Sequence, residues 1–87
     1  MIHKATAKFW KRYDLLPTHV QQVTDKNFDL LLDNPFHPSL HFKEIKHRPG
    51  TWSARAGEDY RAVAILEDDV FFWFWIGPHA EYDRLIR

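Results

Sequence analysis

The sequence predicts an α+β fold, because its two halves carry different hydrophobic patterns. In the first half, apolar residues recur at three- and four-residue steps, which is the spacing of a helix face. In the second half, apolar and polar residues alternate between short turns, as they do on neighbouring antiparallel strands. The length of 87 residues argues for one domain, covering residues 1–87.

Two helices are expected before residue 35. Apolar residues mark the first helix: Phe9, Trp10, Tyr13 and Leu16. Pro17 ends this helix or opens the next one. Thr18 followed by Gln21 resembles a capping box, and Pro17 as the first helical residue fits equally well. An apolar stripe marks the second helix: Val20, Val23, Leu30 and Leu31. The helix should run to about Asp33, because the Asn-Pro pair at 34–35 stops it.

About four strands are expected after the helices. The strand-like segments are residues 40–45, 51–56, 60–67 and 70–76. The last of them is apolar on both faces, which is typical of a strand in the middle of a sheet or covered on both sides. Gly77-Pro78 ends it, and the tail HAEYDRLIR should form a short helical turn or two.

The composition excludes several classes of protein. There is no cysteine, so disulfides and thiolate zinc sites are excluded, and a reducing cytoplasm is the expected location. The longest apolar run, VFFWFWI, is far shorter than the ~20 residues that span a bilayer, so no membrane partner is expected. His37 and His41 are separated by a helix-breaking proline, and no metal site is predicted. The net charge of zero weakens a case for strong non-specific nucleic-acid binding.

Two arginines flank one expected hairpin turn. If the turn centres on Glu58, Arg55 lies opposite Arg61 on the same face, with Cβ atoms ~5 Å apart. Like charges opposed in this way destabilise a sheet, and a phosphate bound by both guanidinium groups would offset that cost. The preceding hairpin places Lys43 roughly opposite Arg55. Alternatively, both arginines are ordinary solvent-facing strand residues or partners of nearby carboxylates. The carboxylates available for this are Glu44, Glu58 and Asp59.

The last hairpin brings a histidine toward the same end of the sheet. It places Trp75 or Ile76 opposite Arg61, so His79 leaves the sheet close to that arginine. A one-residue slip in register would send Arg61 to the other face. An imidazole can transfer protons near neutral pH, although His79 could equally cap the terminal turn. Tyr82 could contact a base or seal the core.

At this point three segments together resemble a known family. The segments are LLLDNPFHPSLHFKEI, WSARAGEDYRAVAILEDD and WIGPHAEYDRLI, preceded by the expected helix pair. In this order they resemble the RelE/ParE superfamily of toxins from type II toxin–antitoxin systems, over nearly the whole chain. The resemblance implies two N-terminal helices packed on an antiparallel sheet of about four strands.

The resemblance also implies a function. RelE-like members cleave messenger RNA on the ribosome and need no metal or other cofactor, whereas ParE-like members block DNA gyrase. Both are neutralised by a cognate antitoxin protein. In the nuclease branch, the positions of Arg55 and Arg61 contact the phosphate, His79 transfers a proton and Tyr82 orients the nucleotide. Lys43 and Lys46 are then expected to bind the RNA backbone.

The sequence also departs from the nuclease pattern. Nuclease members often carry lysines on the strand that here has Thr51 and Ser53, and such toxins are commonly basic, whereas this chain is neutral. Despite these departures, a ribosome-associated messenger-RNA endonuclease is the leading hypothesis. A gyrase-inhibiting toxin and a non-catalytic module that binds a partner through Val63 and Ile65 are the alternatives.

Overall fold

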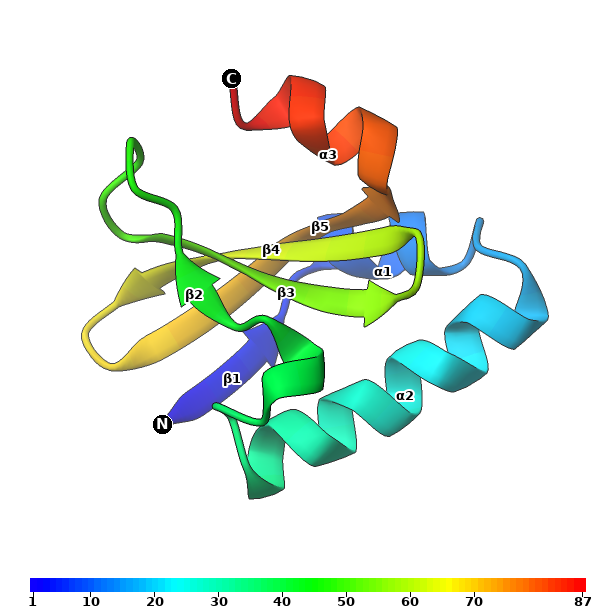
Figure 1. Ribbon diagram of the computed structural model, residues 1–87, viewed down its shortest axis with the longest axis horizontal. Helices are drawn as coiled ribbons and strands as arrows, with labels where there is room; N and C mark the ends of the chain where they lie inside the picture. The colour runs from blue at the N-terminus through cyan, green and yellow to red at the C-terminus, as the bar shows by residue number, and fades with distance from the viewer.

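The computed structural model describes residues 1–87 and contains five strands, three α-helices and one short 3₁₀ helix (Figure 1). The strands are β1 (Ile2–Ala5), β2 (Lys43–Glu44), β3 (Thr51–Gly57), β4 (Tyr60–Glu67) and β5 (Val70–Pro78). The helices are α1 (Ala7–Tyr13), α2 (Thr18–Asp33), the 3₁₀ helix η1 (Pro38–Leu40) and α3 (His79–Leu85). None of these helices is both long and apolar enough to cross a membrane.

The five strands form one sheet in the order β1-β5-β4-β3-β2. The α+β class, the two N-terminal helices and the C-terminal helical turn are confirmed. The sheet is mixed, however, because β1 pairs in parallel with β5, with Ile2 aligned to Val70. The sequence did not indicate this fifth strand. No tight turn joins two parallel strands, so the sequence carries no turn signal for their pairing. In addition, β1 is only four residues long.

A bulge in β5 explains why this strand is apolar on both faces. Val63 pairs with Trp75 but the next residue, Ala64, pairs with Trp73, so Phe74 has no partner across the strand. The extra residue turns Trp73 and Trp75 toward opposite faces, although they are only two positions apart. Trp73 joins the larger core and Trp75 the smaller one. β5 is therefore buried on both sides, as the sequence predicts.

Two cores lie on opposite faces of the sheet. The larger core lies beneath α1 and α2 and contains Phe9, Leu31, Leu40, Phe42, Ala54, Ala56, Ala62, Ala64, Phe71, Trp73 and Ile76. The smaller core lies beneath α3 and contains Ile45, Val63, Trp75 and Tyr82. In Figure 1, α2 and α3 lie on opposite sides of the strands. The Phe71–Trp75 segment contributes its three buried rings to these cores.

Helix α2 packs through small and branched side chains. Val20, Thr24 and Leu31 are its buried residues, whereas Val23 faces solvent, so the buried stripe differs from the expected one by one position. Thr24 satisfies its buried hydroxyl by donating to the carbonyl oxygen of Ala56 at 3.3 Å. The small alanines of β3 and β4 leave room for the helix backbone to approach the sheet.

The start of α2 matches neither of the two expected caps. The helix begins at Thr18, with Pro17 in the capping position and no side-chain hydrogen bond to the helix terminus. A capping box requires the side chain of the third residue after the cap, here Gln21, to accept a hydrogen bond from the backbone N–H of the capping residue. Gln21 instead donates its side-chain N–H to the carbonyl oxygen of Tyr13 at 2.9 Å, which ties α2 to the end of α1.

Most of the segment expected as the first strand is not extended. Pro38 opens the 3₁₀ helix, whose last residue, Leu40, is almost fully buried. His41 follows in the left-handed region with φ of 47°. Only Lys43–Glu44 then pair with β3, so β2 is a two-residue edge strand.

His3 occupies an aromatic environment between β1 and the larger core. Its ring stacks on Phe71 with a centroid separation of 5.1 Å, and Trp73 donates its indole N–H to His3 Nδ1 at 3.0 Å. The pKa of His3 is lowered, first by burial and second by the positive N-terminus. Neutral His3 accepts this hydrogen bond, whereas Nδ1 would lose that capacity once protonated.

We expect the free energy of unfolding to fall in mild acid because of His3. The folded-state pKa lies below the ordinary value of 6.5, so the contribution is complete above 6.5 and is lost as the pH drops through the folded-state value. Urea unfolding between pH 5 and pH 8 should show this slope in the wild type and a shallower one in His3→Gln. The matched control is His19→Gln, because His19 is exposed on α2. An equal slope in wild type and His3→Gln would contradict the assignment.

Candidate functional site

The opposed arginines occupy the face of the sheet that carries α3. Arg55 on β3 pairs directly with Arg61 on β4, as predicted, so their side chains share a face. A bulge follows immediately, because Gly57 rather than Ala56 aligns with Tyr60. Neither arginine forms an ion pair with a carboxylate, and the one close contact between a basic and an acidic side chain joins His79 to Asp83 on α3. The alternative in which carboxylates neutralise these two residues is therefore not what the structure shows.

Arg61 is held against the turn that joins β3 and β4. Its Nη1 donates to the carbonyl oxygens of Gly57, Glu58 and Tyr60 at 3.4, 3.3 and 2.8 Å. Burial and, after it, the positive charge of Arg55 lower the pKa of Arg61. A guanidinium remains charged at all physiological pH values, so the structure retains two cations that repel each other.

Arg55 contains a polar group with no partner in the protein. Its Nε is fully buried and makes no hydrogen bond, although the backbone oxygen of the same residue accepts from the Asn27 side chain at 3.3 Å. A buried donor on a cation is costly to leave unsatisfied. The repulsion between Arg55 and Arg61 makes the pair suited to an anion with several acceptor oxygens, such as a phosphate, whereas the buried Nε has no accessible surface at which such an anion could bind.

Of the two lysines predicted to bind RNA, Lys43 lies on the strand next to Arg55, whereas Lys46 lies in the loop at the opposite end of β3. Lys43 pairs with Ser53 rather than with Arg55, so the predicted register is wrong by two residues. In the structure this hairpin centres on residue 48. A two-residue shift keeps the side chain on the same face, so Lys43 is a diagonal neighbour of Arg55, with Cβ atoms ~7–8 Å apart. Lys46 is exposed in the loop between β2 and β3.

The register of the last hairpin is also corrected. Arg61 pairs with Gly77, not with Trp75 or Ile76. The unpartnered Phe74 accounts for the difference, because a bulge advances every later pair by one residue. Arg61 keeps its predicted face, and the chain leaves the sheet directly beyond it.

His79 is the first residue of α3 and lies at the same turn as Arg61. Its backbone N–H donates to the carbonyl oxygen of Asp59 at 2.7 Å, which ties the start of α3 to the β3–β4 turn. Its Nδ1 lies 3.0 Å from Oδ2 of Asp83, one helical turn later. Sequence reasoning did not single out Asp83, although its spacing of four residues from a histidine in a helix was a usable signal.

Tyr82 is part of the smaller core. Of the two roles that the sequence left open, the structure shows the second: the ring is buried, and the hydroxyl donates to Oγ of Ser53 at 3.1 Å. Its ring meets the His79 ring edge-on at a centroid distance of 5.8 Å. Ser53, where nuclease members often have lysine, is thus committed to anchoring α3.

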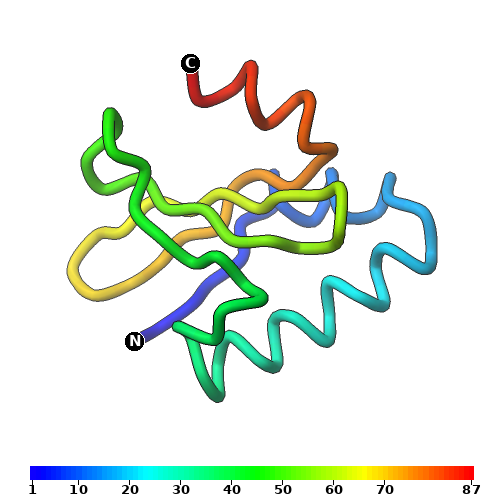
Figure 2. Tube along the Cα trace, in the orientation of Figure 1, coloured from blue at the N-terminus to red at the C-terminus, as the bar shows by residue number.

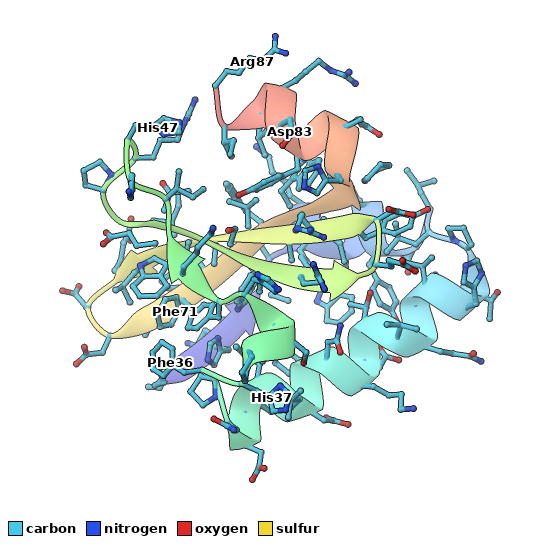
Figure 3. The ribbon with its side chains drawn as sticks, viewed as in Figure 1. Phe36, His37, His47, Phe71, Asp83 and Arg87 are labelled. Carbon is cyan, nitrogen blue, oxygen red and sulfur yellow. The ribbon has the colours of Figure 1, made fainter.

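A second anchor holds the far end of α3. Arg48 in the β2–β3 loop donates to the carbonyl oxygens of Ile86 and Arg87 at 3.1 and 2.6 Å, and His47 also hydrogen-bonds Ile86. Figure 2 shows this loop and the C-terminus on the same side of the sheet, and Figure 3 places His47, Asp83 and Arg87 there. These contacts join residues far apart in the chain, and nothing in the sequence indicated them.

The remaining histidines do not gather. No group of three or more histidine or acidic side chains lies close enough to hold a metal ion. His37 accepts a hydrogen bond from the backbone N–H of Ser39 at 3.2 Å, which stabilises the 3₁₀ turn.

Gly77, opposite Arg61, leads to a prediction about stability. A Cβ at this position would lie 2.8 Å from two atoms of the Trp75 ring, which is buried and cannot swing away freely. We expect Gly77→Ala to lower the free energy of unfolding by about 1–3 kcal/mol, measured by urea unfolding. Adding Trp75→Phe should recover part of this loss, because the smaller ring vacates the clashing positions.

The matched control for this prediction is Gly57→Ala. A Cβ there would meet its neighbours at 3.8 Å or more, which is ordinary contact. An equal loss of stability in the two variants would contradict a steric role for Gly77.

Comparisons with known proteins bear on the fold. No family model matches the sequence, and no curated protein matches it either. Solved structures do match over nearly the whole chain. The RelB-RelE antitoxin-toxin complex from Methanococcus jannaschii aligns with a TM-score of 0.72 and 14% identity, covering 100% of both chains.

Two further structures agree. YafQ from Escherichia coli aligns with a TM-score of 0.70 and 16% identity, covering 92% of this chain and 94% of that one. The toxin-antitoxin complex RelBE2 from Mycobacterium tuberculosis aligns with a TM-score of 0.65 and 22% identity, covering 88% and 95%. Over its full length, the chain therefore has the fold of the RelE-type toxins of toxin–antitoxin systems.

Proposed function

We propose that this protein is the toxin of a type II toxin–antitoxin pair and cleaves messenger RNA on the ribosome. The observation that carries the proposal is the directly opposed pair of Arg55 and Arg61, two cations on one face of the sheet with no carboxylate partner. Such a pair binds a phosphate well and stabilises the extra negative charge that develops on phosphorus during cleavage.

The proposed chemistry needs no metal or other cofactor. The ribose 2′-hydroxyl attacks the adjacent phosphate, which yields a 2′,3′-cyclic phosphate and a free 5′-hydroxyl. Arg55 and Arg61 stabilise the transition state, and His79, at the neighbouring turn, transfers a proton. Lys43 binds the RNA backbone beside the pair, and Lys46 binds it farther away, at the β2–β3 loop.

Tyr82 acts indirectly in this proposal. The buried ring and its bond to Ser53 hold α3 on the sheet and so fix the position of His79. A direct contact between Tyr82 and a nucleotide would require α3 to move.

The proposed protein partner is a cognate antitoxin, encountered in the cytoplasm. Two of the matching structures are complexes of a toxin with its antitoxin, which supports this partner. The alternative of a purely partner-binding module relied on an exposed patch of Val63 and Ile65. That patch does not form, because Val63 is 0% exposed beneath α3, whereas Ile65 is 41% exposed.

The test combines purified protein with ribosomes and an end-labelled message. Cleaved transcripts that end in a 2′,3′-cyclic phosphate are expected. The neutral charge of the chain favours a second candidate, inhibition of DNA gyrase, and a supercoiling assay tests it in parallel. Intact RNA together with inhibited supercoiling would replace the nuclease by the gyrase inhibitor. Intact RNA and unaffected gyrase would contradict both.

A further inference from the structure

The pair of His79 and Asp83 lies at the point where α3 leaves the sheet. The two residues occupy adjacent turns, and Nδ1 of His79 lies 3.0 Å from Oδ2 of Asp83. Their side chains are 45% and 54% exposed, so solvent and a bound ligand can both reach the pair. An exposed contact of this kind adds little to stability, at most ~1 kcal/mol even when the imidazole is protonated. Its interest lies in what it does to the imidazole.

The orientation of the His79 ring is restrained on three sides. The backbone N–H is bound to Asp59, Nδ1 faces Asp83, and the ring contacts Tyr82 edge-on. Tyr82 is itself immobilised by its hydrogen bond to Ser53. Nε2 is the one ring nitrogen without a partner in the protein.

We propose that Asp83 is a positioning residue that keeps the proton of neutral His79 on Nδ1 and leaves Nε2 free to act as the general base. This inference rests on the proposed nuclease function. An ionised carboxylate only accepts hydrogen bonds, so the nitrogen that faces it carries the hydrogen. The partner of one ring nitrogen decides the protonation of the other.

The proposed cleavage step needs no reactant other than water. Nε2 of His79 takes the proton of the 2′-hydroxyl while the O2′–P bond forms and the P–O5′ bond breaks. The departing 5′-oxygen takes a proton from water, and the hydroxide that remains then takes the proton from the His79 imidazolium, which returns His79 to its neutral form. The imidazolium that forms is stabilised by the Asp83 carboxylate.

Asp83 also affects the arginine pair. Its effect as a negative charge near the anion site can therefore be separated from its effect on the His79 ring. Burial and Arg55 lower the pKa of Arg61, and the Asp83 carboxylate partly offsets this lowering. Its negative charge therefore lies within electrostatic reach of the anion site. Removing that charge should help RNA bind, whereas losing the restraint on His79 should slow the reaction. We therefore expect kcat and KM to fall together in Asp83→Asn.

The experiment compares Asp83→Asn with Glu81→Gln. Both variants remove one negative charge from α3, but Glu81 is exposed and does not contact His79. Cleavage of labelled message on ribosomes should show kcat reduced at least about 10-fold in Asp83→Asn, which is part of the ~10²–10⁴-fold that a general base supplies. Glu81→Gln should keep the wild-type kcat, and Asp83→Glu should recover part of the loss.

The second measurement is independent of activity. Nitrogen-15 NMR of the imidazole should show the proton of neutral His79 on Nδ1 in the wild type and in Glu81→Gln, and a changed tautomer ratio in Asp83→Asn. A proton on Nε2 in the wild type overturns the inference, whether or not RNA is cleaved. So does an active enzyme in which Asp83→Asn keeps both kcat and tautomer.

Failure of the proposed function looks different. If the wild type cleaves no RNA but NMR places the proton on Nδ1, the nuclease proposal is wrong, whereas the control of the His79 tautomer by Asp83 is supported.

Discussion

Replacing Arg61 with alanine is expected to lower the rate of RNA cleavage by about 10²- to 10³-fold, which is the usual cost of removing one preorganised donor from a transition-state site. The guanidinium is fixed by three backbone carbonyl oxygens through Nη1 alone, so it is already in place before substrate binds. Arg55, directly opposite, cannot replace it, because in the proposed mechanism both cations are needed on one phosphate. Single-turnover cleavage of a labelled message on ribosomes measures the loss, and growth inhibition on overexpression should weaken in parallel.

Two further variants make this prediction specific. Arg61→Lys keeps the charge but loses the planar fork of donors, so it should recover only part of the rate. Arg84→Ala removes an exposed arginine of α3 away from the pair and should leave cleavage unchanged. Because the bonds of Arg61 also brace the β3–β4 turn, urea unfolding must show Arg61→Ala to be folded at the assay temperature. A folded Arg61→Ala with wild-type cleavage would remove the basis for the proposed chemistry.

Replacing Trp73 with alanine is expected to cost about 3–5 kcal/mol of the free energy of unfolding. The ring is only 4% exposed, and it lies in the larger core between β1, β5 and the N-terminal helices. The substitution opens a cavity and also leaves Nδ1 of His3 without its donor. A domain of this size is typically stable by ~5–15 kcal/mol, so the loss is a large share of the total.

Urea unfolding with two companion variants separates the contributions. Trp73→Phe retains most of the ring and removes only the indole N–H, so it should lie between wild type and Trp73→Ala. Trp10→Ala removes the same side chain from α1, where the ring is 49% exposed, and should cost much less. If Trp10→Ala is the more damaging of the two alanine variants, the assignment of the core around Trp73 is wrong.

Local patterns predicted the parts of the fold that local physics determines. The helix ending at Asp33 followed from apolar spacing and the Asn-Pro stop, and the strand at 60–67 matches β4 residue for residue. The opposition of Arg55 and Arg61 followed from one short turn, because a tight hairpin leaves little freedom in register. The candidate site could therefore be located from the sequence.

The missing parts depend on contacts between distant segments. The parallel pairing of β1 with β5 and the bond between Ser53 and Tyr82 join residues that no turn or period links. The errors in register have the same origin. Pairing of residues by counting assumes a regular ladder, and the unpartnered Phe74 breaks that assumption.

The unpaired Phe74 also constrains how this protein can vary. Deleting one residue at that point would restore a regular ladder and rotate everything downstream by one position, so that His79 and the whole of α3 would emerge on the wrong side of the strands. Relatives that share the site should therefore tolerate many different side chains along β5, but no indel between the bulge and Gly77. The spacing of this segment, more than its composition, would carry the evolutionary signature of the site.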